Sequence, residues 1–136
     1  MIYLLIPLLL YCLSGIADAV MDKINHHYSK SIFSKYDEQY WNPRISWKNK
    51  YVDNDPKNGF KKIKIFRHFK ITKHVAFTDA WHLFKSIKEV LIGIAITFGV
   101  YLCINLSLLY SLIFLLVLGI LRNFCFTLFY HKLLNK

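Results

Sequence analysis

The side chains of this chain that could do chemistry are carboxylates and imidazoles at helical spacing. They form two groups whose members return to one face of an α-helix: Asp18, Asp22 and His26, and Asp79, His82 and Glu89. Spacings of three or four residues let one helix supply two ligands to a metal ion. Carboxylate and imidazole ligands suit Zn, Mn or Fe. If the two faces meet, Asp22, His26, Asp79 and His82 are the predicted ligands of a divalent metal ion.

Two kinds of chemistry follow from such a cluster. In the first, a metal-bound water attacks a phosphoester or acyl bond of a lipid, with Glu89 or Asp18 as the catalytic general base. In the second, the carboxylates form ion pairs with Lys85, Lys88 or Arg122 and bind no metal. Arg122 favours the second possibility, ion pairing without a metal. It lies in an apolar stretch, where its charge needs an acidic partner or a path to water.

The two polar faces require two helices that extend beyond the membrane surface, so that their polar residues lie at or outside it. We expect the first helix to continue to about residue 31. The second should begin with Thr78 as its N-cap and Asp79 in its first turn. Small residues let transmembrane helices approach closely, so Gly15 and Gly93 are the predicted contact between the two.

Apolar residues fill both ends of the chain, and the charge lies between them. Residues 1–17 and 90–121 hold no charged side chain, whereas residues 23–88 hold 15 of the 18 Lys and Arg residues. Hydrophobic residues make up 55% of the chain although its net charge is +10. A bilayer requires this segregation. Anionic headgroups explain the adjacent bases more simply than nucleic acid does. The sequence therefore predicts an all-α integral membrane protein with about three transmembrane helices.

The expected organisation has three parts. Residues 1–31 form the first transmembrane helix with a cytoplasmic extension, and residues 32–77 form an interfacial segment. Residues 78–136 form a helix that enters a transmembrane hairpin, at 86–104 and 108–130, followed by a short basic tail. The apolar stretch is too long for one span, which needs about 20 residues. A re-entrant hairpin is the alternative to two full spans.

The orientation follows from the positive-inside rule. That rule places the basic segment in the cytoplasm and the N-terminus outside the cell membrane. The alternative is a cleaved signal peptide, because Ala17-Asp18-Ala19 resembles a cleavage site. The absence of a basic residue before the apolar run argues against cleavage.

The interfacial segment combines bases, aromatic residues and turn-forming dipeptides. Its predicted anionic lipid-binding residues are Arg44, Trp47, Lys48 and Lys50, because aromatic rings prefer the headgroup level and bases prefer phosphate. Its turn residues predict mostly irregular structure. Partial alternation over residues 60–77 predicts a hairpin or an interfacial strand pair. A short solvated loop is the alternative to a segment lying along the membrane.

Several sequence blocks resemble a group of small bacterial and phage-type membrane proteins. The blocks are SGIADAVMD at 14–22, YSKSIF at 28–33, WNP at 41–43, SWKNKY at 46–51 and TDAWHLFK at 78–85. The resemblance covers about residues 14–85 and implies a recurring unit. It brings no known activity, cofactor or assigned site with it.

The expected function is that of a non-catalytic adaptor, assembly protein or pore subunit with a polar Asp/His cluster at the cytoplasmic membrane face. Its expected partners are the lipid bilayer and anionic headgroups, and a pore would require a homo-oligomer. The alternative is the metal-dependent membrane hydrolase described above. No P-loop, nucleophile elbow, H-E-x-x-H or kinase signature is present.

Overall fold

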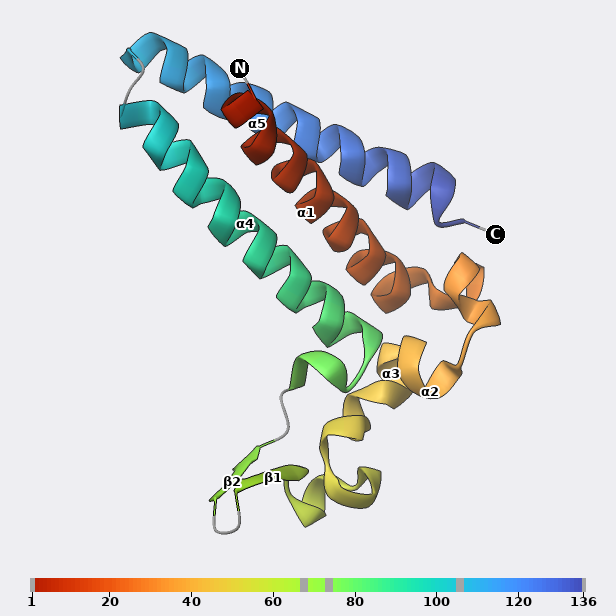
Figure 1. Ribbon diagram of the computed structural model, residues 1–136. Helices are drawn as coiled ribbons and strands as arrows, with labels where there is room; N and C mark the ends of the chain where they lie inside the picture. The colour runs from red at the N-terminus through yellow and green to blue at the C-terminus, as the bar shows by residue number, and fades with distance from the viewer. Residues whose placement is uncertain (1, 67–68, 73–74, 105–106, 136) are drawn as a thin grey trace.

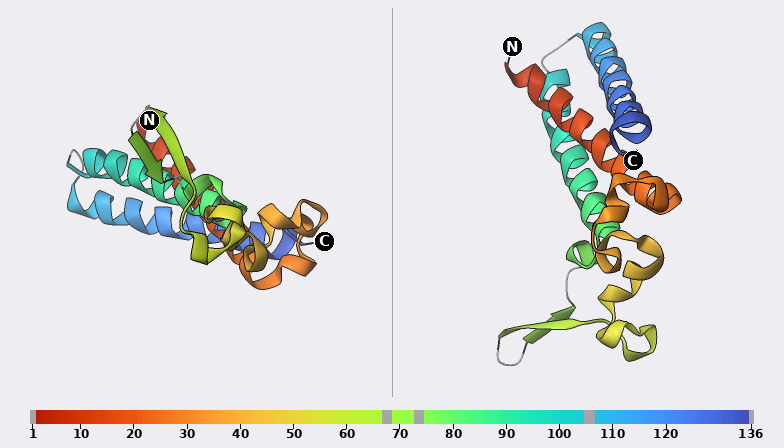
Figure 2. Two further views of the ribbon diagram at one scale, coloured as in Figure 1. Left: turned by 90° about the horizontal axis from the view of Figure 1, so that it is seen from below. Right: turned by 90° about the vertical axis from the view of Figure 1, so that its right-hand side faces the viewer.

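Three long helices dominate the fold. The computed structural model describes residues 2–66, 69–72, 75–104 and 107–135. The long helices are α1 (Ile2–His27), α4 (Ala80–Ile104) and α5 (Leu108–Leu128). They run in alternating directions, with α1 between α4 and α5 (Figure 1). The start of α1, the end of α4 and the start of α5 lie at one end. The C-terminus and the rest of the chain lie at the other (Figure 2).

The ends of these helices agree only in part with the sequence prediction. The structure describes α4 to Ile104 and begins α5 at Leu108; the predicted break at residues 105–106 lies outside the described residues. The first helix ends earlier than predicted: α1 stops at His27 and a 3-10 turn, η1 (Tyr28–Lys30), follows. Pro7 lies inside α1 without ending it.

The basic segment is not mostly irregular but a succession of single helical turns. Its first half contains η2 (Ile32–Lys35), α2 (Glu38–Trp41), α3 (Pro43–Ser46) and η3 (Trp47–Lys50), and its second half contains η4 (Val52–Asn54), η5 (Pro56–Asn58) and η6 (Val75–Phe77). The dipeptides that predicted turns begin several of these helices. Asn42 accepts a hydrogen bond from the Arg44 backbone N–H, with Pro43 in the first helical position. An N-cap followed by proline starts a helical turn as readily as a β-turn.

A short hairpin completes this segment. Strands β1 (Lys62–Phe66) and β2 (Phe69–Thr72) pair antiparallel, with Ile63 opposite Ile71. The alternation of apolar and basic residues predicted this pairing, and the hairpin is confirmed.

The hydrophobic core lies at the end of the bundle that carries the basic segment. Ala19, Val20 and Ile24 of α1 pack there with Phe33, Ala80 and Leu134. The Phe33 ring stacks on Trp41 at a centroid distance of 4.6 Å. The C-terminal π-helical turn, η7 (Phe129–Leu133), closes the core: the Ile32 backbone N–H donates to the Leu134 carbonyl at 3.1 Å. The first part of the basic segment, through α3, is therefore packed against the long helices, whereas η4, η5 and the hairpin extend away from them (Figure 1).

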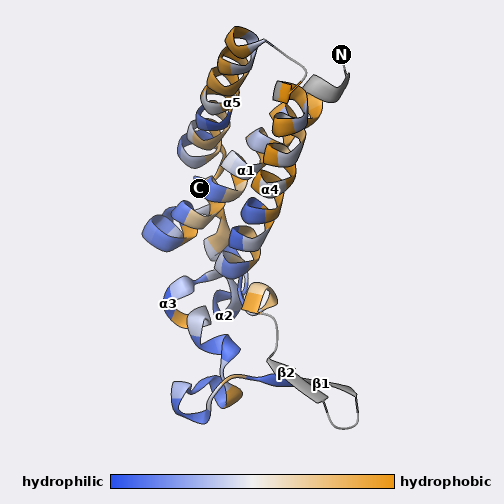
Figure 3. Ribbon diagram, turned by 90° about the vertical axis from the view of Figure 1, so that its left-hand side faces the viewer, coloured by the Kyte–Doolittle hydropathy of each residue, from blue (hydrophilic) through white to orange (hydrophobic). Residues whose placement is uncertain are grey.

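Large apolar side chains cover the outer surface of the long helices. On α5, eight large hydrophobic residues are each more than half exposed: Leu108, Leu109, Tyr110, Leu112, Leu115, Leu116, Ile120 and Phe124. Figure 3 shows that hydrophobic residues predominate along the long helices and hydrophilic residues in the segment below them. In the part of the chain that the structure describes, two helices are long and apolar enough to cross a membrane, Leu5–Lys30 and Leu108–Leu133. A continuous exposed apolar surface along a helix marks a site of interaction with a membrane or another protein.

Candidate functional site

One carboxylate links all three long helices. Asp18 of α1 accepts a hydrogen bond from Lys88 Nζ of α4 at 3.0 Å through one oxygen, and from Arg122 Nη2 of α5 through the other. All three side chains are 24% exposed. The sequence prediction that the carboxylates pair with Lys88 or Arg122 is confirmed for Asp18. A carboxylate held between two cations ties helices together and is a poor general base.

The close helix contact lies beside this trio, and it is not the predicted one. A Cβ atom at Gly15 would lie 2.5 Å from the Arg122 carbonyl oxygen, so glycine permits α1 and α5 to approach there. A Cβ atom at Gly93 would meet nothing within 4 Å. The predicted Gly15–Gly93 contact is therefore wrong, because Gly15 faces α5 and Gly93 lies on an open face of α4.

Asp79 and His82 form a second, separate polar pair at the start of α4. His82 Nδ1 lies 2.7 Å from Asp79 Oδ2, and the His82 backbone N–H donates to Asp79 Oδ1 at 2.9 Å. Asp79 is thus the N-cap of α4, one residue later than the predicted Thr78. The Thr78 hydroxyl lies 2.7 Å from the Val75 carbonyl. The pKa of the Tyr40 phenol is raised above its usual value. Burial of the phenol is the main cause, and the negative charge of Asp79 is the second.

The remaining members of the predicted cluster lie apart from both groups. Glu89 is exposed and 4.0 Å from Lys85 of its own helix. His26 is exposed at the end of α1, where its Nε2 lies 3.3 Å from Asn25 Nδ2. Asp22 is half-buried on α1. Among the described residues, no three His, Cys, Asp or Glu side chains could together hold a metal ion. The structure does not support the predicted metal site of Asp22, His26, Asp79 and His82, because Asp79 and His82 pair with each other at the start of α4 while His26 is exposed at the end of α1.

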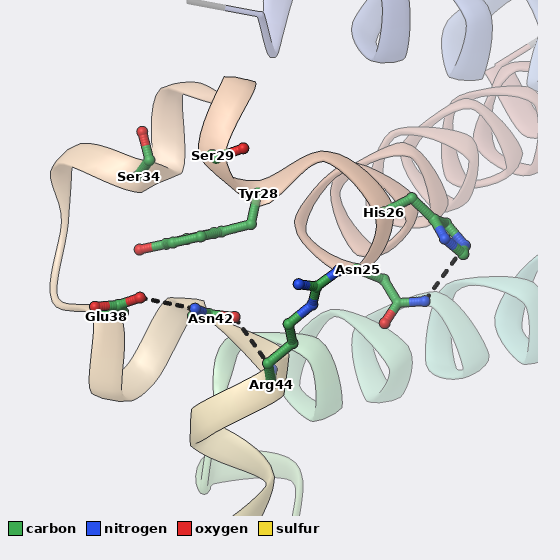
Figure 4. Close-up of a pocket in the computed structure, with 8 residues that line it drawn as sticks. All are labelled: Asn25, His26, Tyr28, Ser29, Ser34, Glu38, Asn42 and Arg44. Atoms are coloured by element: carbon green, nitrogen blue, oxygen red, sulfur yellow. Dashed lines mark hydrogen bonds between the residues drawn. The ribbon is translucent and has the colours of Figure 1, made fainter.

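A polar pocket of about 410 Å³ lies where α1 ends and the basic segment begins. Asn25 and His26 at the end of α1 line one side, and Arg44 extends from α3 toward them (Figure 4). Glu38 is engaged within the wall, because its carboxylate accepts a hydrogen bond from Asn42 Nδ2 at 2.8 Å. This pocket offers a ligand the Arg44 guanidinium, several polar groups and the Glu38 carboxylate.

The other predicted lipid-binding residues lie on the surface below that pocket. Trp47 is 40% exposed, and Lys48 Nζ lies 5.8 Å from the centre of its ring. Lys50 Nζ lies 5.5 Å from the Tyr51 ring. Bases held over aromatic rings form a surface that suits the headgroup layer.

Sequence reasoning missed two buried polar residues. Lys23 is 4% exposed, and its Nζ donates to the Tyr130 carbonyl at 3.1 Å while lying 4.7 Å from the centre of that ring. Ser46 is 1% exposed, and its hydroxyl has no hydrogen-bond partner among the described residues. Lys23 lies on the same helix face as Ala19. The long aliphatic part of a lysine side chain next to a small residue is a sequence signal that could have predicted the burial of Lys23. Ser46 gave no comparable signal.

Comparisons of the chain with protein-family models, with curated proteins and with solved structures found no match.

Proposed function

We propose that the chain is a three-span membrane protein that holds a basic, folded segment against the membrane surface as an adaptor or assembly protein. The observation that carries this proposal is that the uncharged stretches of the three long helices share one boundary. The uncharged stretches are residues 2–17, 90–104 and 108–121. Each ends next to a charged residue on the side of the bundle that carries the basic segment: Asp18, Glu89 and Arg122. At 1.5 Å per residue these stretches measure about 24, 22 and 21 Å.

The Asp18–Lys88–Arg122 trio lies at that boundary. An intramembrane charge is costly unless it is paired, and these three groups neutralise one another in part. Above the trio the outer faces of α4 and α5 carry apolar side chains. A lipid environment for these faces accounts for their exposure, whereas a soluble protein would have to cover them.

The topology that fits this proposal places the basic segment in the cytoplasm. Residues 32–77 carry 11 Lys and Arg against four Asp and Glu residues. Cytoplasmic leaflets are anionic, and each base near such a surface contributes about 1 kcal/mol of attraction. Three spans from an outside N-terminus also bring the basic C-terminal tail to the cytoplasm, next to the segment that it packs against. The protein therefore belongs in the cell membrane with its N-terminus outside.

The polar pocket gives this surface a specific ligand, an anionic lipid headgroup. Arg44 can form paired hydrogen bonds to a phosphate, a geometry that a lysine lacks. The pocket opens where α1 leaves the predicted membrane region, so a headgroup would reach it while its acyl chains remain in the bilayer. Asn25 and His26 add polar groups on the opposite side.

Native mass spectrometry of the detergent-solubilised protein tests the headgroup proposal. We expect wild-type protein to retain phosphatidylglycerol in preference to phosphatidylcholine. The Arg44→Gln variant should bind the anionic lipid about tenfold more weakly, which corresponds to one lost charge-assisted contact of about 1.4 kcal/mol. Lys57→Gln is the matched control, because Lys57 is an exposed base of η5 outside the pocket.

Either of two kinds of result would contradict this proposed function. Equal retention of both lipids by wild-type protein, or equal anionic-lipid binding by Arg44→Gln and Lys57→Gln, would exclude a headgroup site at Arg44. Release of the intact protein from membranes by alkaline carbonate would exclude the three-span arrangement itself.

A further inference from the structure

The polar pocket at the end of α1 contains two opposite charges that do not pair with each other. Arg44 and Glu38 both line the pocket, and both residues are exposed. Among the described residues, neither the Arg44 guanidinium nor the Glu38 carboxylate forms an ion pair. Each charge is therefore accessible to a ligand that carries the opposite charge.

Asn42 holds the two charged residues in place. Its Nδ2 donates to Glu38 Oε1 at 2.8 Å, and its Oδ1 accepts a hydrogen bond from the Arg44 backbone N–H at 3.1 Å. Asn42 is 9% exposed, so this bridge belongs to the folded wall of the pocket. Figure 4 shows the Glu38 carboxylate and the Arg44 guanidinium at different ends of the pocket. The contact with Asn42 uses one oxygen of the carboxylate, which leaves the other oxygen to accept from a ligand.

A ligand that carries both charges would satisfy both ends of this pocket. A phosphate pairs with a guanidinium through charge-assisted hydrogen bonds, and an ammonium pairs with a carboxylate in the same way. A primary ammonium has three N–H donors, whereas the quaternary ammonium of choline has none. The pocket volume of about 410 Å³ lies within the range of small-molecule sites, roughly 300–1,000 Å³. A headgroup without a positive charge would leave the Glu38 carboxylate without a partner.

We propose that the pocket recognises an aminophospholipid, the phosphate diester of a primary amino alcohol. This inference rests on the proposed headgroup function and specifies its ligand. Arg44 binds the phosphate, Glu38 accepts hydrogen bonds from the ammonium, and Asn42 fixes the positions of both residues. Phosphatidylserine and phosphatidylethanolamine share this chemistry. The net negative charge of phosphatidylserine also suits the basic segment, so we expect it to bind more tightly than phosphatidylethanolamine.

Native mass spectrometry of the full-length protein in detergent tests this inference with two matched pairs of lipids. Phosphatidylserine and phosphatidylglycerol carry the same net charge, but only phosphatidylserine has an ammonium. Phosphatidylethanolamine and phosphatidylcholine are both zwitterionic, but only phosphatidylethanolamine has N–H donors on its nitrogen. We expect wild-type protein to prefer phosphatidylserine over phosphatidylglycerol about tenfold, as for one charge-assisted contact. Phosphatidylethanolamine should likewise bind more tightly than phosphatidylcholine.

Glu38→Gln separates recognition of the ammonium from general electrostatic attraction. Glutamine keeps an oxygen that accepts from Asn42 Nδ2, so the wall is preserved while its charge is removed. The preference for phosphatidylserine over phosphatidylglycerol should fall from about tenfold to about one. Binding of phosphatidylglycerol should equal or exceed that of wild type, which also shows that the pocket is intact.

Asp53→Asn is the matched control. It removes an exposed acidic charge from the same segment, outside the pocket, and asparagine tolerates the positive φ of 52° at this position. This variant should keep the wild-type preference for phosphatidylserine. Arg44→Gln should weaken both anionic lipids equally and leave the ratio between them unchanged.

Equal binding of phosphatidylserine and phosphatidylglycerol by wild-type protein would overturn the aminophospholipid assignment. A Glu38→Gln variant that keeps the wild-type preference would overturn it as well. Neither result changes the loss of phosphatidylglycerol expected for Arg44→Gln, so the headgroup function can stand when this inference fails. Unchanged binding of both lipids by Arg44→Gln would instead remove the headgroup function, and this inference with it.

Discussion

Replacing Asp18 by asparagine should loosen the contact of α1 with both neighbouring helices. The substitution keeps the size of the side chain and removes its charge. Lys88 and Arg122 then face each other without an acid between them, in a site where each is 24% exposed. Asparagine can still accept one hydrogen bond, but its amide nitrogen would point a donor at a cation.

The expected loss follows from the geometry of the two ion pairs. Two unit charges 3.0 Å apart attract by about 5.5 kcal/mol at an effective dielectric constant of 20. Desolvation of the three groups and repulsion between the two cations offset most of this attraction. Breaking a fully buried pair costs about 3–5 kcal/mol, and a surface pair is worth about 0–1 kcal/mol. At this intermediate exposure we expect Asp18→Asn to lose about 2–3 kcal/mol of unfolding free energy.

The assay is unfolding of the detergent-solubilised protein by titration with sodium dodecyl sulfate, followed by helical circular dichroism. Asp22→Asn is the matched control, because Asp22 lies one turn further along α1 and forms no ion pair in the described part of the chain. Adding Lys88→Gln and Arg122→Gln to Asp18→Asn should recover at least half of the loss, since no uncompensated charge remains. If Asp18→Asn and Asp22→Asn unfold within 0.5 kcal/mol of each other, roughly the scatter of exposed substitutions, the trio does not hold the bundle together.

Two further predictions concern packing. Gly15→Ala would place a methyl group 2.5 Å from the Arg122 carbonyl oxygen and must push α5 away, so it should cost about 1–3 kcal/mol in the same titration. Gly93→Ala meets no atom within 4 Å and should leave stability unchanged or slightly raised; equal losses in the two glycine variants would contradict the assigned α1–α5 contact. Leu134→Ala, in the core at 5% exposure, should cost about 2–3 kcal/mol, whereas Leu133→Ala, at 52% exposure, should change the midpoint little. A Leu134 effect no larger than that of Leu133 would mean that the C-terminus does not close the core.

The positions of the helices could be predicted from the sequence because one physical signal determines them. Long uncharged apolar stretches form helices in a bilayer, and the polar residues around 105–107 indicated where the second stretch breaks. The basic segment was harder to predict. Its short helical turns begin at Asn42-Pro43 and Asp55-Pro56, dipeptides that start turns and helices alike. Local sequence does not decide between these outcomes; at Asn42-Pro43, packing of α3 against α1 favours the helical turn.

The site could be predicted in its residue types but not in its partners. Helical periodicity correctly placed Asp18 on a polar face of α1, yet it could not say which neighbour that face meets. The structure inserts α1 between two helices, so Asp18 reaches cations on both sides while Glu89 points outward. Asp79 and His82 satisfy each other within one helical turn. For the six predicted groups to converge, their faces of α1 and α4 would have to meet without a third helix between or beside them.

In the proposed three-span arrangement, the position of the Asp18 trio would also constrain the membrane around it. The uncharged stretches of about 21–24 Å are shorter than a hydrocarbon core of about 30 Å. Either the bilayer thins around the bundle or the trio lies slightly within it, and long Lys and Arg stems relieve both situations by reaching toward the headgroups. Asp18 opposes that movement because it holds both cations toward the bundle axis. Its removal should therefore do more than weaken three helices: it should free Lys88 and Arg122 to extend to the surface and let α4 and α5 tilt away from α1. The destabilisation of Asp18→Asn should accordingly be smaller in short-chain phosphatidylcholine bilayers, where the headgroups lie nearer to the trio, than in long-chain ones.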